Sequence, residues 1–187
     1  PQGVSRSSSV LQDMQNDELT GLLKSILTAV FLVFLVMAMQ FESVRFSLMV
    51  MTCIPFSLIG SFLLMYLSGT TFSMISMMGI LMLMGIVVNN GILLVDTANQ
   101  LRETGQSIEE ALVQAGKIRI RPILMTTLTT ILSMLPMLLT NDPTMKIMNS
   151  MAMVIIGGLV ASTVLAMFVM PAFYMLLTRR KKRPLKR

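Results

Sequence analysis

Five long apolar runs dominate the hydrophobic pattern of this sequence. They cover approximately residues 22–39, 46–67, 72–95, 122–139 and 151–177. A helix needs about 20 apolar residues to cross about 30 Å of hydrocarbon, so each run predicts a membrane-spanning helix. Lys24 can snorkel to the interface, and the kink that Pro55 introduces is tolerated in membrane helices. The pattern therefore predicts an all-α, polytopic membrane bundle with five transmembrane helices.

The polar connection between the third and fourth runs has a pattern of its own. Gly105 can end the preceding helix, and Ser107 with Glu110 has the spacing of a capping box that opens a new helix. An apolar stripe follows at helical spacing: Ile108, Ala111, Leu112, Ala115 and Ile118. This pattern predicts a short amphipathic helix over 107–118 in the membrane interface, or alternatively a soluble connector helix. Pro122 is then expected in the first turn of the fourth span.

Polar side chains inside the runs are costly in a membrane and often mark function. Asn89 and Asn90 are adjacent in the third run, and Thr126, Thr130 and Ser133 share one face of the fourth. The alternative interpretation is that each hydroxyl bonds a carbonyl of its own helix and that the asparagines only hold helices together.

Small residues allow close contact between helices in a membrane. They are Gly79 and Gly85 in the third run, and Gly157, Gly158, Ala161 and Ser162 in the fifth, where 157–161 and 158–162 have the small-xxx-small spacing. We therefore expect the third and fifth helices to lie inside the bundle.

Composition agrees with a membrane protein and excludes soluble or disordered classes. Hydrophobic residues make up 54% of the 187 residues, and only 13% are charged, against about a quarter in soluble domains. The net charge of +6 would ordinarily suggest nucleic acid, but its distribution argues against such a partner. Twelve of the fifteen Lys and Arg residues lie in 40–45, 96–121 and 179–187. This bias predicts a cytoplasmic C-terminus and an extracytoplasmic N-terminal end.

Several kinds of chemistry are not expected. Cys53 is the only cysteine and the sequence has no histidine, which excludes a disulfide framework, a zinc site and a histidine-based catalytic triad. The 21 methionines could suggest a thioether path for Cu(I), but they occur throughout the runs, as core residues do. We therefore expect no enzyme, no metal site and no cofactor.

Two features that the sequence lacks predict that this chain is part of a longer protein. No Asp, Glu, Lys, Arg or His occurs in 46–95, 122–139 or 151–177, so these segments lack the kind of side chain that carries a proton within a membrane. The chain begins with Pro1 rather than Met, and no span precedes its extracytoplasmic end. We expect it to be the C-terminal piece of a longer protein.

Four motifs in order carry a family resemblance. They are Met-Gln-Phe-Glu-Ser at 39–43, Ile-Pro at 54–55 with Gly60, the stretch 85–96 around the two asparagines, and Arg-Ile-Arg-Pro-Ile-Leu-Met-Thr-Thr at 119–127. Together they resemble the last five transmembrane helices of a resistance-nodulation-division (RND) efflux transporter of the hydrophobe/amphiphile multidrug branch.

The resemblance implies a twelve-helix inner-membrane pump built from two repeats, each carrying a large extracytoplasmic loop domain. Residues 1–20 would end that loop domain, 21–178 would form the membrane bundle, and 179–187 would be a basic cytoplasmic tail. Such pumps are proton antiporters, usually homotrimers, and a periplasmic adaptor protein is an expected partner. The other partners are the lipid bilayer and the N-terminal half of the transporter.

The resemblance also implies a proton relay. Two aspartates of the N-terminal half would face a lysine, a threonine and an arginine of this half. Thr126 and Arg119 match the last two, whereas Asn89 stands at the lysine position, next to Asn90. Asparagine can only donate and accept hydrogen bonds, so the coupling ion stays open.

The leading hypothesis is the C-terminal membrane portion of a proton-coupled exporter of amphiphilic or drug-like compounds. The alternatives are a related RND-superfamily exporter, such as a protein-export subunit or a lipid exporter, and a non-transporting membrane scaffold.

Overall fold

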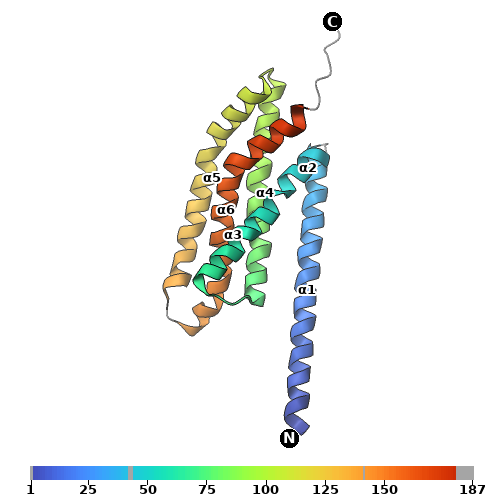
Figure 1. The fold of residues 1–187 in the computed structure, drawn as a ribbon, viewed down its shortest axis with the longest axis vertical. Helices are drawn as coiled ribbons and strands as arrows, with labels where there is room; N and C mark the ends of the chain where they lie inside the picture. The colour runs from blue at the N-terminus through green and yellow to red at the C-terminus, as the bar shows by residue number, and fades with distance from the viewer. Residues whose placement is uncertain (1, 42–43, 141, 180–187) are drawn as a thin grey trace.

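The fold is a bundle of long helices, as seen in a computed structural model that describes residues 2–41, 44–140 and 142–179 (Figure 1). The helices are α1 (Gln2–Phe41), α2 (Val44–Met51), α3 (Cys53–Ser68), α4 (Met74–Glu103), α5 (Ile108–Leu139) and α6 (Pro143–Arg179). No strand occurs among the described residues, and the predicted all-α class is confirmed.

The described part contains five segments that are long and apolar enough to cross a membrane, which confirms the five predicted spans. They are Gln12–Phe41, Phe46–Ser68, Met74–Glu103, Ile108–Leu139 and Ile147–Phe168. Figure 1 shows the α4–α5 connection and α2 at one end of the bundle, here called the upper end. The α3–α4 and α5–α6 connections lie at the opposite, lower end.

The second span consists of two helices instead of one. The helix is interrupted at Thr52, whose N–H donates to the carbonyls of Leu48 and Met49, both at 3.2 Å. Pro55 follows three residues later and has no N–H to donate to the carbonyl of Met51, where α2 ends. The expected proline kink is therefore present as a break between α2 and α3.

The connection between α4 and α5 has the predicted caps. Gly105 adopts a φ of +91°, just after α4 ends. Ser107 and Glu110 form the capping box: the Glu110 N–H donates to Ser107 Oγ at 3.3 Å, and the Ser107 N–H donates to Glu110 Oε2 at 3.2 Å.

Beyond these caps the structure differs from the sequence prediction. The expected short helix at 107–118 and the fourth span form one continuous helix, and Pro122 lies inside α5 and not in its first turn. Pro122 removes only one backbone donor, and α5 is held along its length by packing against α4 and α6.

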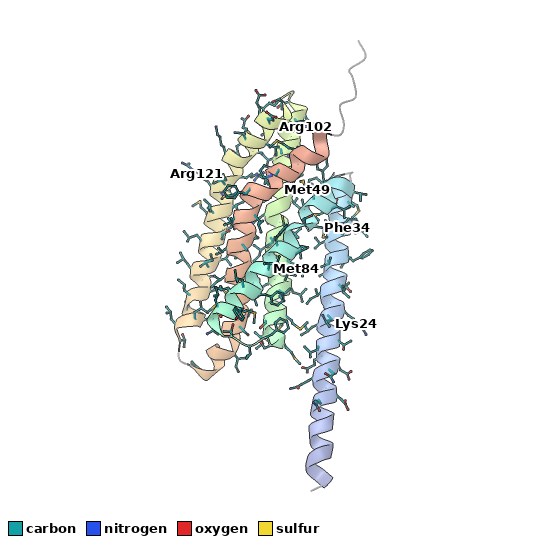
Figure 2. The ribbon with its side chains drawn as sticks, viewed as in Figure 1. Lys24, Phe34, Met49, Met84, Arg102 and Arg121 are labelled. Carbon is teal, nitrogen blue, oxygen red and sulfur yellow. The ribbon has the colours of Figure 1, made fainter. Side chains whose placement is uncertain are left out.

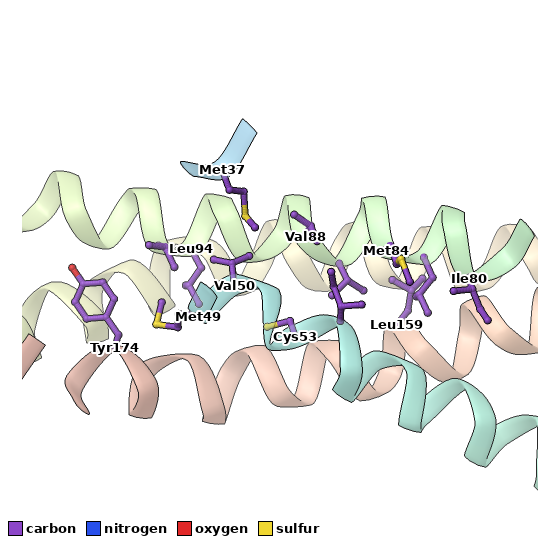
Figure 3. Packing of buried hydrophobic residues seen from close by; sticks show 14 of the residues in the cluster. Met37, Met49, Val50, Cys53, Ile80, Met84, Val88, Leu94, Leu159 and Tyr174 are labelled. Atoms are coloured by element: carbon purple, nitrogen blue, oxygen red, sulfur yellow. The ribbon is translucent and has the colours of Figure 1, made fainter. Parts of the chain in front are cut away.

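Helix α6 forms the centre of the bundle, packed against α3, α4 and α5 (Figure 3). Val154, Ile155 and Leu159 of α6 are fully buried, as is Leu83 of α4. Helix α1 stands at the edge and buries Met37 against the rest; Ile26, Val30 and Val33 are half-buried against the same core, and the apolar side chains on its outer face are exposed. The expectation of interior third and fifth helices agrees with these positions of α4 and α6.

The two ends of the chain bear on the predicted domain limits. Residues 2–20 are helical and continuous with the first span, so α1 extends well past the apolar run (Figure 1). Their assignment to the end of an extracytoplasmic loop domain stays a prediction. Of the predicted basic tail at 179–187, residues 180–187 lie outside the described residues.

Candidate functional site

The two adjacent asparagines of α4 occupy different environments. Asn89 is exposed on the line of α4 that also exposes Met78, Met82 and Gly85. Asn90 is half-buried and lines a small cavity of about 10 Å³ inside the bundle. No hydrogen bond joins either carboxamide to another residue that the structure describes. The amide of Asn89 is therefore open to a partner from outside this chain, and that of Asn90 faces a cavity within it.

The hydroxyl groups of α5 bond within their own helix. Thr126 Oγ1 donates to the Ile123 carbonyl at 3.0 Å, Thr130 Oγ1 to the Thr126 carbonyl at 2.8 Å, and Ser133 Oγ to the Thr130 carbonyl at 2.8 Å. Thr126 and Ser133 are exposed. This bonding agrees with the local interpretation of the stripe. Each hydroxyl oxygen still keeps capacity to accept a further bond.

Arg119 has a partner that the sequence did not indicate. Its Nε donates to Thr97 Oγ1 at 2.6 Å, which ties α5 to α4, while Thr97 Oγ1 donates to the Leu93 carbonyl at 2.7 Å. Thr97 is eight residues beyond Asn89, about 12 Å along a helix at 1.5 Å per residue. The structure therefore places Arg119 nearer the upper end of α4 and does not bring it to Asn89.

The structure contains a buried pair of hydroxyl groups that the sequence pattern did not predict. Thr127 of α5 and Thr163 of α6 share a hydrogen bond of 3.1 Å, and both side chains are buried. Thr127 is four residues after Ile123, which is also buried, so extension of the apolar stripe of α5 beyond Pro122 would have found it. Polar contacts between the helices thus involve Thr127, the neighbour of the predicted Thr126.

A second polar contact closes the upper end of the bundle. Tyr174 of α6 donates its hydroxyl to Asn99 Oδ1 at 2.6 Å and accepts a bond of 3.1 Å from Arg102 Nη1. The Tyr174 ring stacks on Phe46 of α2 with 5.4 Å between ring centroids. Figure 2 shows Arg102 at this end, together with Arg121 of α5. These contacts hold α2, α4 and α6 together at the upper end.

The small residues lie at close helix crossings with one exception. A Cβ atom on Gly157 would lie 2.6 Å from the Gly60 carbonyl oxygen, and one on Gly60 would overlap Ala161. A Cβ on Gly158 would overlap Leu83. A Cβ atom on Gly79 would lie 3.2 Å from the Met151 carbonyl oxygen. The one exception is Gly85, which has nothing within 4 Å of its Cβ position. Ser162 lies buried in α6, where its Oγ donates to the Leu159 carbonyl at 3.1 Å.

In the part of the chain that the structure describes, no three His, Cys, Asp or Glu side chains gather where they could hold a metal ion. The chemistry that this arrangement offers is hydrogen bonding: an exposed carboxamide at Asn89, a carboxamide in an internal cavity at Asn90, and hydroxyl groups on α5 and α6.

Comparison with known proteins identifies the family. The model of the AcrB/AcrD/AcrF family matches residues 1–178. The swarming motility protein SwrC of Bacillus subtilis is 37% identical over 170 residues, which are 90% of this chain and 16% of the relative. The multidrug resistance protein MdtC of Erwinia amylovora is 35% identical over 181 residues, 96% of this chain and 17% of the relative. The cobalt-zinc-cadmium resistance protein CzcA of Cupriavidus metallidurans is 34% identical over 152 residues, 81% of this chain and 14% of the relative.

This chain spans about a sixth of the length of these relatives. The match nevertheless covers every described helix, from α1 to the end of the span in α6. The chain belongs to the AcrB/AcrD/AcrF family of RND efflux transporters.

Proposed function

We propose that this chain is the C-terminal membrane portion of a proton-coupled RND exporter of amphiphilic or drug-like compounds. One observation supports the proposal most strongly: Asn89 and Thr126 are polar, lie within apolar spans, and are exposed on the outside of this five-span bundle. The printed name of the relative MdtC, a multidrug resistance protein, favours drug-like substrates.

Exposure of a carboxamide to lipid is unfavourable, because hydrocarbon offers it no hydrogen-bond partner. Protein outside this chain would therefore cover Asn89, and we assign that role to the N-terminal half of the transporter. No Asp, Glu, Lys, Arg or His occurs in 46–95, so the proton would be carried by acidic side chains of the covering half. Asn89 and Thr126 would hold those side chains by hydrogen bonds, while Asn90 and Arg119 would support the site from within the bundle.

The orientation and partners follow from the same proposal. The upper end, with Arg102, Lys117, Arg119 and Arg121, would face the cytoplasm, and the N-terminal end of α1 would be extracytoplasmic. The protein would reside in the cell membrane as a homotrimer that works with a periplasmic adaptor. It would act by transport and not as an enzyme, with no cofactor and no nucleic-acid partner.

Thr126→Ala in the full-length transporter tests the proposal. We expect lower efflux of a fluorescent amphiphilic dye at unchanged abundance in the membrane, because the substitution removes one hydroxyl and one methyl group from an exposed position of the bundle. Thr129→Ala is the matched control: Thr129 is also exposed and also bonds its own helix, to the Met125 carbonyl at 2.7 Å. It lies about 200° around the helix from buried Thr127, on the side away from the bundle. Equal efflux by the two variants would reduce Thr126 to a packing residue.

Export of divalent cations is the second candidate function, because the relative CzcA is named a cobalt-zinc-cadmium resistance protein. Growth of cells that produce the full-length transporter separates the two candidates. Protection against amphiphilic dyes and drugs supports the first, whereas protection against cobalt, zinc or cadmium alone supports the second.

A further inference from the structure

The small cavity beside Asn90 lies where four helices meet. Its polar lining residues are Cys53 of α3, Asn90 of α4, and Ser162 and Thr163 of α6, while α5 contributes Ile123. Asn90 lies in the second half of the apolar run 72–95, so the cavity lies inside the apolar layer and nearer to its upper side. Figure 3 shows Cys53 among the buried side chains of this core.

The hydrogen-bonding groups around the cavity are only partly used. The Asn90 carboxamide, with two donors and one acceptor oxygen, bonds no other residue that the structure describes. Ser162 Oγ uses its proton on the Leu159 carbonyl, and Thr163 Oγ1 shares one bond with Thr127. Both hydroxyl oxygens therefore keep capacity to accept, and Asn90 has protons to give.

The size and the lining of the cavity define its ligand. A space of about 10 Å³ corresponds to roughly one water-sized probe, and a buried water needs two to four polar partners. We infer that this cavity binds one ordered water molecule, which links Asn90 of α4 to Ser162 and Thr163 of α6. A sodium ion fits the lining less well, because no carboxylate lies there to balance its charge in an apolar interior.

The inference separates the two asparagines by role. Asn89 lies outside the bundle, and Asn90 is a positioning residue that holds α4 against α6 through the water. This role does not depend on the proposed transport activity, because every group involved belongs to this chain.

A direct test is the structure of the full-length transporter in a lipid nanodisc, at a resolution that shows ordered water. We expect a density peak within hydrogen-bond distance of the Asn90 carboxamide and of the Ser162 or Thr163 hydroxyl. In Thr163→Val, which keeps the side-chain shape, the peak should be lost or weakened. An Asn90 carboxamide bonded directly to Thr163 without a peak between them, or a peak that appears only with added sodium chloride, would overturn the inference.

The S–H stretching band of Cys53 provides a second measurement in solution. Subtracting the infrared spectrum of the Cys53→Ala transporter isolates this band from those of other thiols. Asn90→Leu should displace the water and shift the band, whereas Asn89→Leu, the adjacent and exposed control, should leave it in place. Equal bands in wild type and Asn90→Leu, or equal shifts in both variants, would contradict a water held by Asn90.

Discussion

Alanine at Gly157 will separate α3 from α6, because the two helices touch there through their backbones. A Cβ atom on Gly157 would lie 2.6 Å from the Gly60 carbonyl oxygen, 2.8 Å from Leu64 Cβ and 3.1 Å from Ser61 Cα. These are atoms of the backbone or next to it, so no side-chain rotation can relieve the overlap. The helices must move apart.

The magnitude follows from two opposing effects. Overpacking a core by one methyl group costs about 1–3 kcal/mol, and replacing glycine by alanine in a helix returns up to about 1 kcal/mol. The separation also strains the bond that Ser61 Oγ donates to the Val154 carbonyl at 2.7 Å. We expect a net loss of about 1–2 kcal/mol, which corresponds to roughly a 5- to 30-fold larger population of the open form.

Cys53 allows this population to be measured. It is the only cysteine of the chain and is buried in α3. In a full-length transporter whose other cysteines have been replaced, labelling by a thiol reagent reports opening of this part of the bundle. When closing is faster than labelling, the rate follows the open population, so Gly157→Ala should be labelled roughly 5- to 30-fold faster than wild type.

Gly116→Ala is the matched control for this experiment. Gly116 lies in the span of α5 and lines a cavity within this chain, and nothing comes within 4 Å of its Cβ position. Its variant should be labelled no faster than wild type. Equal labelling rates for Gly157→Ala and Gly116→Ala would refute the reasoning, because the close crossing of α3 and α6 would then make no difference to stability.

Two further substitutions test the contacts at the upper end of the bundle. Ser107→Ala removes the oxygen that accepts the Glu110 N–H, so about 1 kcal/mol of cap stability should be lost. Amide hydrogen exchange in the first turn of α5 should then be roughly fivefold faster. Unchanged exchange would show that the capping box does not stabilise α5. Tyr174→Phe keeps the ring but removes the hydroxyl that bonds Asn99 and Arg102. The full-length transporter should lose about 1 kcal/mol of stability and unfold at a lower temperature. An unchanged midpoint of thermal unfolding would contradict a stabilising role for these bonds.

The long-range pattern of the fold could be predicted from the sequence, because the membrane requires about 20 apolar residues in every span. The caps at Gly105 and Ser107 could be predicted as well, since each depends on a few neighbouring residues. The effects of the prolines could not. Pro55 accompanies a break at Thr52, whereas Pro122 leaves α5 continuous, so the same residue type in two spans has two different outcomes.

The candidate site was predicted only in part. The sequence shows that Asn89 and Asn90 are unusual residues for a span, but two adjacent positions point about 100° apart on a helix. Only the packing of α4 shows that Asn90 faces the cavity and that Asn89 is exposed. The bond from Arg119 to Thr97 joins residues on two different helices, so it depends on the way α4 and α5 align, which no local pattern determines.

Proton movement coupled to export is the most direct test of the central proposal. The full-length transporter would be reconstituted in liposomes that hold a pH gradient and a pH-sensitive dye. The account predicts that an exported amphiphile dissipates the gradient, and that Thr126→Ala slows this dissipation while Thr129→Ala does not. Export that continues without proton movement, or that requires a sodium gradient instead, would contradict it.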